Sequence, residues 1–195
     1  MSQHSNLLRA KRMFWYFLLL SFMLWAIPFF IRLFFIDVPE IKNTSSTKSL
    51  DIVSEITAHA IKNDTWSVFC LILINNLKVC VINIVGGVML GISTIINLIV
   101  NGFLAADTFA TVHKNGMGVG KILKHTLPHC FELLGIWLSG AIGLSIAKII
   151  IDYMRGKELP KADYFRFIGK WTTITVLIIL LAAFVEAYIS MTINK

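Results

Sequence analysis

The chain has 195 residues, with 18 Lys plus Arg against 11 Asp plus Glu and a formal net charge of +7 at pH 7. Hydrophobic residues make up 56% of it and charged residues only 15%, whereas soluble domains carry about 25% charged residues. Together with a mean hydropathy of +0.75, this excludes a water-soluble domain. At about 20 residues for each membrane span, the length allows one bundle of a few helices.

Neither a nucleic-acid-binding protein nor a disulfide-stabilised one is expected. The cations border the apolar runs, where they anchor to lipid headgroups, and no segment interleaves basic and aromatic residues as nucleic-acid binding would require. Cys70, Cys80 and Cys130 lie within or beside apolar runs. Because they are odd in number and not in polar loops, they imply no disulfide framework.

The first apolar run, residues 13–31, follows Arg9, Lys11 and Arg12 and carries no charge. It is longer than the core of a signal peptide, about 7 to 15 residues, and no small-residue cleavage site follows it. It is therefore predicted to be a retained signal anchor that starts in the cytoplasm.

Residues 37–65 are polar and are predicted to form an extracytoplasmic loop. A Thr/Ser-rich linker at 43–49 precedes residues 51–62, in which apolar side chains recur on one helical face. This pattern predicts an amphipathic helix that lies on the membrane or on the bundle.

Between Trp66 and Ala106 the only formal charge is Lys78, and apolar character continues to Val112. The run is too long for one span and fits two, so a turn is predicted between Gly86 and Thr94. A basic connection at 113–125, a fourth span at 126–147, a charged loop at 148–170 and a fifth span at 171–191 complete the prediction. The fold class is all-α, a polytopic membrane bundle with an anchor and loop region at 1–62 and a multi-span region at 63–195.

Charge placement favours five spans over four. Five spans with a cytoplasmic N-terminus place nine of the 18 cations inside, concentrated in two short segments. An inverted four-span arrangement places more cations inside but exports the N-terminal basic cluster. Since the first helix usually dominates orientation, the five-span arrangement is preferred.

Small residues form a stripe along the fourth span. Gly135, Ser139, Gly143 and Ala147 recur every four residues, and Gly87 and Gly91 begin a shorter stripe. Such stripes let two helices approach closely. The favoured prediction is packing against another span of the same chain, and the alternative is a seam between copies in a homo-oligomer.

Polar groups also occur within the spans. His125, His129 and Glu132 stand at i, i+4 and i+7, on one helix face, and Pro128 favours a first-turn position for them. A metal site and a proton or ion relay are two interpretations, but no H-E-x-x-H motif or Cys pair supports a metal. The favoured interpretation is a hydrogen-bonded clamp between helices.

Other intramembrane polar residues are weaker signals. Glu186 in the last span can pair with His129, with Lys148 or with a partner's cation. Five asparagines can join helices by side-chain hydrogen bonds: Asn75, Asn76, Asn83, Asn97 and Asn101. The Gly-rich residues 116–120 follow no strand and lack a G-K-[ST] sequence, so no nucleotide site, cofactor or metal is predicted. No nucleophile and base arrangement indicates an enzyme.

The order of these features resembles the stage II sporulation protein M family. The matching pieces are Asn75-Asn76, the stretch from Gly86-Gly87 to Gly91, Asn101-Gly102, Leu127-Pro128-His129 with Glu132, and Ala182-Ala183 with Glu186-Ala187. The resemblance covers about residues 63–191, and the Leu-Pro-His-x-x-Glu segment is its most specific part. Cys130 stands where the family usually has Gly.

The resemblance implies a five-span bacterial inner-membrane protein without catalytic activity. The sporulation member anchors peptidoglycan-remodelling enzymes in the membrane, and some relatives accompany ABC-type exporters in bacteriocin production and immunity. Two hypotheses follow for this chain. As a scaffold, its outer loop docks envelope proteins. As a transporter subunit, its bundle oligomerises, His129, Glu132 and Glu186 line a path, and residues 151–167 couple to an ATP-binding subunit.

Overall fold

The structure is a computed structural model that describes residues 3–35, 64–114, 116, 118, 120, 130–158 and 162–190. It contains α1 (Gln3–Phe35), α3 (Thr65–Gly86), α4 (Ile92–Lys114), α6 (Cys130–Met154), α7 (Ala162–Val185) and a π-helical turn, η1 (Glu186–Ser190). Five of these helices are long and apolar enough to cross a membrane, and the described residues include no strand. The predicted all-α polytopic bundle is confirmed. The predicted amphipathic helix at 51–62 lies outside the described residues.

Long uncharged runs form helices because a helix satisfies every backbone polar group within its own segment, as the bilayer core requires. Helix α3 begins directly after Asp64, whose carboxylate accepts a hydrogen bond from the backbone N–H of Ser67 at 3.2 Å. This N-cap satisfies one of the free donors at the helix start. Helix α1 continues through Pro28.

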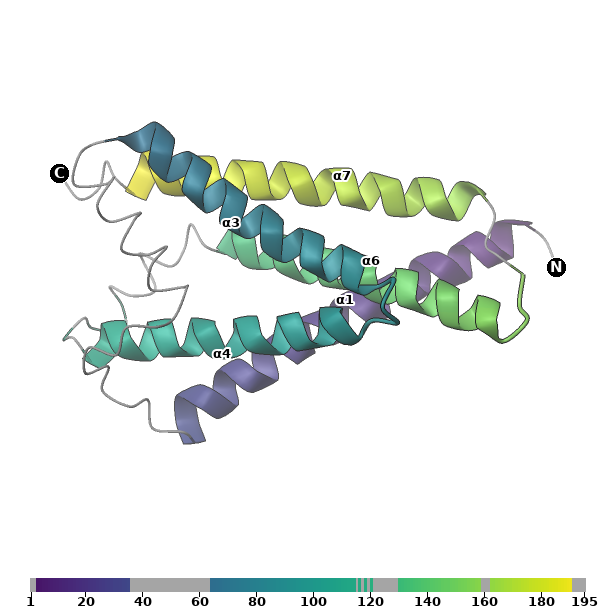
Figure 1. The fold of residues 1–195 in the computed structure, drawn as a ribbon, viewed down its shortest axis with the longest axis horizontal. Helices are drawn as coiled ribbons and strands as arrows, with labels where there is room; N and C mark the ends of the chain where they lie inside the picture. The colour runs from purple at the N-terminus through teal and green to yellow at the C-terminus, as the bar shows by residue number, and fades with distance from the viewer. Residues whose placement is uncertain are drawn as a thin grey trace.

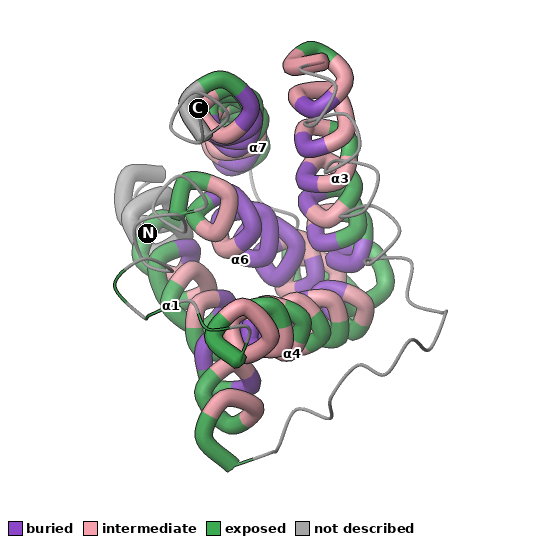
Figure 2. Tube along the Cα trace, turned by 90° about the vertical axis from the view of Figure 1, so that its left-hand side faces the viewer, coloured by how far each residue is buried: buried purple, intermediate pink, exposed green. Residues whose placement is uncertain are grey.

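Helix α6 occupies the centre of the bundle. It contacts α1, α3, α4 and α7, and Figure 2 shows buried residues around most of its circumference. About 61% of the apolar stretch of α6 is buried inside the protein, compared with 17–28% of the corresponding stretches of the other four spans. The four outer helices therefore leave most of their apolar surface for lipid.

The helix directions agree with five consecutive crossings (Figure 1). Helices α3 and α6 run parallel, because Asn76 contacts Glu132 and Asn83 contacts Ser139. The N-terminal part of α1 and the connection between α6 and α7 consequently lie toward the same end of the bundle, as Figure 1 shows. These are the two basic segments that were predicted to lie on the same side of the membrane.

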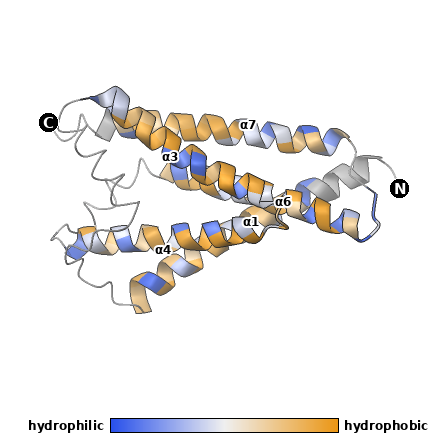
Figure 3. Ribbon diagram, in the orientation of Figure 1, coloured by the Kyte–Doolittle hydropathy of each residue, from blue (hydrophilic) through white to orange (hydrophobic). Residues whose placement is uncertain are grey.

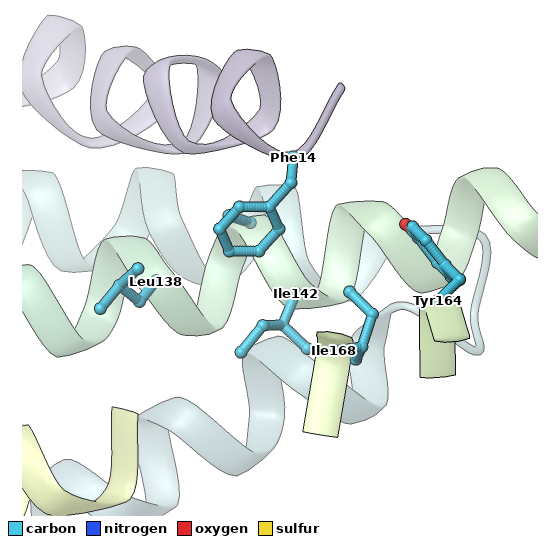
Figure 4. Packing of buried hydrophobic residues seen from close by; sticks show 6 residues of the cluster. Phe14, Leu138, Ile142, Tyr164 and Ile168 are labelled. Atoms are coloured by element: carbon cyan, nitrogen blue, oxygen red, sulfur yellow. The ribbon is translucent and has the colours of Figure 1, made fainter. Parts of the chain in front are cut away.

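Aromatic packing joins α1 to α7 at this end. The buried ring of Phe14 stacks on Trp171 with ring centroids 5.2 Å apart and meets Phe167 edge-on at 5.3 Å. Figure 4 shows the surrounding cluster, whose members come from α1, α6 and α7: Phe14, Leu138, Ala141, Ile142, Tyr164 and Ile168. Burial of these rings fixes the start of the first span against the start of the last.

The predicted turn between Gly86 and Thr94 is confirmed, with α3 ending at Gly86 and α4 starting at Ile92. Leu90 and Gly91 have φ angles of 56° and 82°. This left-handed backbone is costly for a residue such as Leu and easy for Gly. The chain thereby reverses within a few residues.

The predicted charged loop at 148–170 is too long. Helix α6 continues to Met154 and α7 already begins at Ala162. Lys148 pairs with Asp152 one helical turn later, and Lys157 reaches the same carboxylate at 2.9 Å. Hydropathy marks only the part of a helix that lies in lipid, whereas these ion pairs allow the helix to extend beyond it.

Candidate functional site: a polar seam inside the bundle

Asn83 is the centre of the intramembrane hydrogen bonding. Its side chain is fully buried, and its amide donates to the backbone oxygen of Ile136 at 3.2 Å and to the hydroxyl of Ser139 at 2.9 Å. Its amide oxygen accepts from Asn97 at 2.8 Å, and its backbone oxygen accepts from Thr94 at 2.7 Å. One residue of α3 is therefore bonded to both α4 and α6.

A second contact lies two turns away on the same face of α3. The Asn76 amide donates to the Glu132 carboxylate at 2.5 Å. Asn76 lies in the middle of α3, about 16 Å along the helix from Thr65. Glu132 lies in the first turn of α6, where the helix dipole favours a negative charge. A carboxylate is thus held near mid-span depth.

Between these contacts the thiol of Cys80 lies 3.7 Å from the backbone oxygen of Gly135. We call the whole arrangement the polar seam; it comprises Asn76, Cys80, Asn83, Thr94, Asn97, Glu132, Gly135 and Ser139. Because its members occupy i, i+4 and i+7 positions on α3, they share one helix face. That face of α3 contacts α6 and also the N-terminal part of α4, where Thr94 and Asn97 lie.

Glycines allow the backbones of α3 and α6 to approach at the end of the polar seam. A Cβ atom at Gly143 would stand 2.1 Å from the backbone oxygen of Asn83, and one at Gly87 would stand 2.3 Å from that of Gly143. A Cβ at Gly91 would lie 3.2 Å from Ala147. The structure therefore places these small residues against other helices of the same chain.

The same is true of Gly135, where an added Cβ would meet the end of the Ile179 side chain at 2.4 Å. Gly102, noted for its place in the family pattern, lies against α1, and a Cβ there would stand 2.3 Å from the backbone oxygen of Trp25. Gly140 was not predicted to be a packing residue. A Cβ at this position would lie 2.2 Å from the Ser21 hydroxyl oxygen.

Two of the asparagines singled out by sequence are not in the polar seam. Asn101 donates to the backbone oxygen of Asn97, within α4, at 2.7 Å. Asn75 is half-buried, and it lies about 100° around α3 from Asn76. Adjacent positions on a helix point to different sides, so the Asn75-Asn76 pair contributes one residue to the polar seam.

Glu186, the second acidic residue that the sequence analysis singled out within a span, opens the π-helical turn η1, which packs against α3. Lys148 is bonded to Asp152 near the C-terminal end of α6, close to the start of α7, whereas Glu186 follows the end of α7. The predicted alternative of a Glu186–Lys148 pair is therefore wrong. His125, Pro128 and His129 lie outside the described residues. The predicted clustering of His125 and His129 with Glu132 therefore stays a prediction.

An ion pair between α1 and α4 was not predicted from the sequence. The guanidinium of Arg32 lies 2.6 Å from the carboxylate of Asp107, and both side chains are partly buried. The two residues are 75 positions apart. Arg32 was predicted only as the end of the first span, and no local pattern links it to its partner.

Lys78 is a charged residue of α3 that faces away from the bundle. It lies on the exposed side of α3, and within the described part of the chain no carboxylate lies near enough to form an ion pair with it. A lysine at the centre of a membrane helix costs about 2.5 to 3.5 kcal/mol on insertion scales. Its position is thus unfavourable for the protein alone.

The groups of the polar seam form hydrogen bonds between helices. Among the residues the structure describes, no three His, Cys, Asp or Glu side chains gather closely enough to hold a metal. A cavity of about 260 Å³ between α1, α6 and α7 is lined by apolar and tryptophan side chains: Trp15, Leu18, Leu134, Trp137, Leu138, Trp171 and Ile178. It lies apart from the polar seam.

Comparisons with known proteins agree with this architecture. An uncharacterized protein of Methanocaldococcus jannaschii is 33% identical over 126 residues, which cover 63% of this chain and 70% of that protein. No solved structure matches the chain significantly. The sequence model of the family described as stage II sporulation protein M matches residues 13–191, almost the whole of the bundle. This chain therefore belongs to the stage II sporulation protein M family.

Proposed function

We propose that this protein is a non-enzymatic scaffold of the bacterial cytoplasmic membrane, with its N-terminus in the cytoplasm, and that it recruits envelope proteins such as peptidoglycan-remodelling enzymes. The observation that carries the proposal is the use of the polar seam. Asn76, Asn83 and Asn97 bond to neighbouring helices, as expected of a rigid anchor. The two basic segments at one end of the bundle support this orientation.

In this proposal the extracytoplasmic segment 43–62 provides the docking surface. We expect that replacing residues 43–62 by a Gly/Ser linker of equal length will abolish recovery of envelope partners, because the bundle is retained but the recruiting segment is lost. The measurement is crosslinking in native membranes followed by mild solubilisation and quantitative mass spectrometry. Undiminished recovery of the same partners would contradict the proposed role of this segment.

A second function is favoured by the position of Glu132 at mid-span depth. An acidic residue there marks ion or proton pathways in many transporters. In that case the bundle is the membrane subunit of an ABC-type exporter, Glu132 and Glu186 belong to the path, and an ATP-binding subunit co-purifies. Recovery of such a subunit in place of envelope proteins would reject the scaffold.

Glu132→Gln separates the two functions. Glutamine retains an oxygen that accepts from Asn76 but cannot ionise. For a scaffold we expect partner recovery within about twofold of the unmodified protein, because an uncharged hydrogen bond still joins α3 to α6.

The matched control is Glu158→Gln, which makes the same substitution in the connection between α6 and α7. Both variants are compared at equal membrane abundance. Loss of an export or immunity activity in the Glu132 variant, with the Glu158 variant intact, would support a relay and contradict a purely structural carboxylate.

A further inference from the structure

Lys78 lies close to the middle of α3. It is about 20 Å along the helix from Thr65 and about 12 Å from Gly86, at 1.5 Å per residue. The helix is about 33 Å long and matches a hydrocarbon core of about 30 Å. The charge therefore belongs to the inner third of the bilayer, and Figure 3 shows hydrophilic residues interrupting the apolar surface of α3 near its middle.

The ammonium group cannot reach water easily. The Cα–Cβ bonds of a helix tilt toward its N-terminus, which for Lys78 is the more distant membrane surface. The nearer surface lies about 12 Å away, beyond the four-carbon stem of the side chain. Depth therefore argues against a lipid headgroup as the partner of Lys78.

The side chain also points away from the bundle. Lys78 is five residues from Asn83, which places it about 140° around the helix axis from that residue at 3.6 residues per turn. Its neighbours on the same side are exposed apolar residues: Ile74 at 64%, Val81 at 55% and Val85 at 55%. Figure 2 shows this exposed side of α3 opposite its buried contact with α6. The result is an apolar helix face with one cation at its centre.

A second copy of the chain is a less favoured partner, because the acidic residues described in its spans already have partners of their own. Of the described acidic residues within the spans, Glu132 is bonded to Asn76, Asp107 is paired with Arg32, and Glu186 already has an interaction partner. Intramembrane lysines ordinarily pair with an opposite charge. These observations favour a different polypeptide as the source of the opposite charge.

We propose that the outer face of α3, formed by Ile74, Lys78, Val81 and Val85, binds a transmembrane helix of another protein that carries an Asp or Glu near its middle. The apolar residues pack against that helix, and Lys78 pairs with its carboxylate. The surface is independent of segment 43–62. It deepens the scaffold proposal by adding an intramembrane contact, and it applies equally to a transporter subunit.

The test uses the purified full-length chain in phosphatidylcholine vesicles, labelled with a fluorescence donor at its C-terminus. The probe is a synthetic Leu-rich transmembrane peptide with one central Glu and an acceptor dye, compared with peptides that carry Gln or Leu there. We expect energy transfer to show about tenfold tighter association of the Glu peptide than of the Leu peptide, since polar contacts in membranes have about this effect.

Lys78→Met should remove this preference without harming the fold, because methionine leaves the apolar face intact and removes a costly charge. Lys170→Met is the control, since it removes an exposed lysine nearer the start of α7. The control should retain the preference.

Equal association of the Glu and Leu peptides would overturn the proposal, and so would a Glu preference that survives Lys78→Met. A preference abolished by anionic phosphatidylglycerol would indicate a lipid partner and overturn it as well. Self-association that depends on Lys78 would also overturn it in favour of a second copy. Because the vesicles contain no envelope protein, failure here would leave the scaffold test on segment 43–62 unaffected.

Discussion

Gly143→Ala is expected to destabilise the bundle by about 3 kcal/mol, the upper part of the usual range for overpacking. The added methyl group would lie 2.1 Å from the backbone oxygen of Asn83 and 2.8 Å from the Thr94 hydroxyl. Backbone atoms cannot turn aside as a flexible side chain can, so α3 and α6 must separate. The measurement is the thermal unfolding midpoint of the purified protein in detergent.

Gly169→Ala is the matched control. Gly169 also lies within a helix, and a Cβ atom there would meet nothing within 4 Å. Because alanine favours helices over glycine, this variant should be as stable as the unmodified protein or slightly more so. Equal stability of the two variants would show that α3 and α6 are farther apart at Gly143 than the structure indicates.

Asn83→Leu is expected to cost roughly 2 kcal/mol. Leucine removes two donated hydrogen bonds, to Ile136 and Ser139, and one accepted from Asn97. Each such bond between membrane helices contributes about 0.6 kcal/mol on average. Unfolding should occur at a lower temperature, and crosslinking between α3 and α4 should become less specific.

The comparison for this substitution is Asn101→Leu, which exchanges the same residue types on α4. The described bonds of Asn101 go to Asn97 within its own helix, so we expect a smaller effect. A loss at Asn101 equal to that at Asn83 would mean that polarity alone matters. The position of Asn83 between three helices would then have no special importance.

The number of spans and the place of the tight turn were predictable from sequence because both depend on local composition. A bilayer admits only long apolar helices, and their ends are marked where charges begin or where glycines loosen the chain. The turn between Gly86 and Ile92 agrees with this expectation. The end of α6 differs from its predicted position, because Lys148 and Asp152 stabilise a helix that continues past the apolar run.

The roles of individual polar residues were decided by tertiary structure. Asn75 and Asn76 are neighbours of the same type, yet only Asn76 faces α6, where it meets Glu132. Likewise, Arg32 acquires its partner Asp107 only when α1 lies beside α4. Composition determines that a segment crosses the membrane, but the rotation of each helix about its axis depends on packing against its neighbours. That rotation determines which side chains join the polar seam and which, like Lys78, face outward.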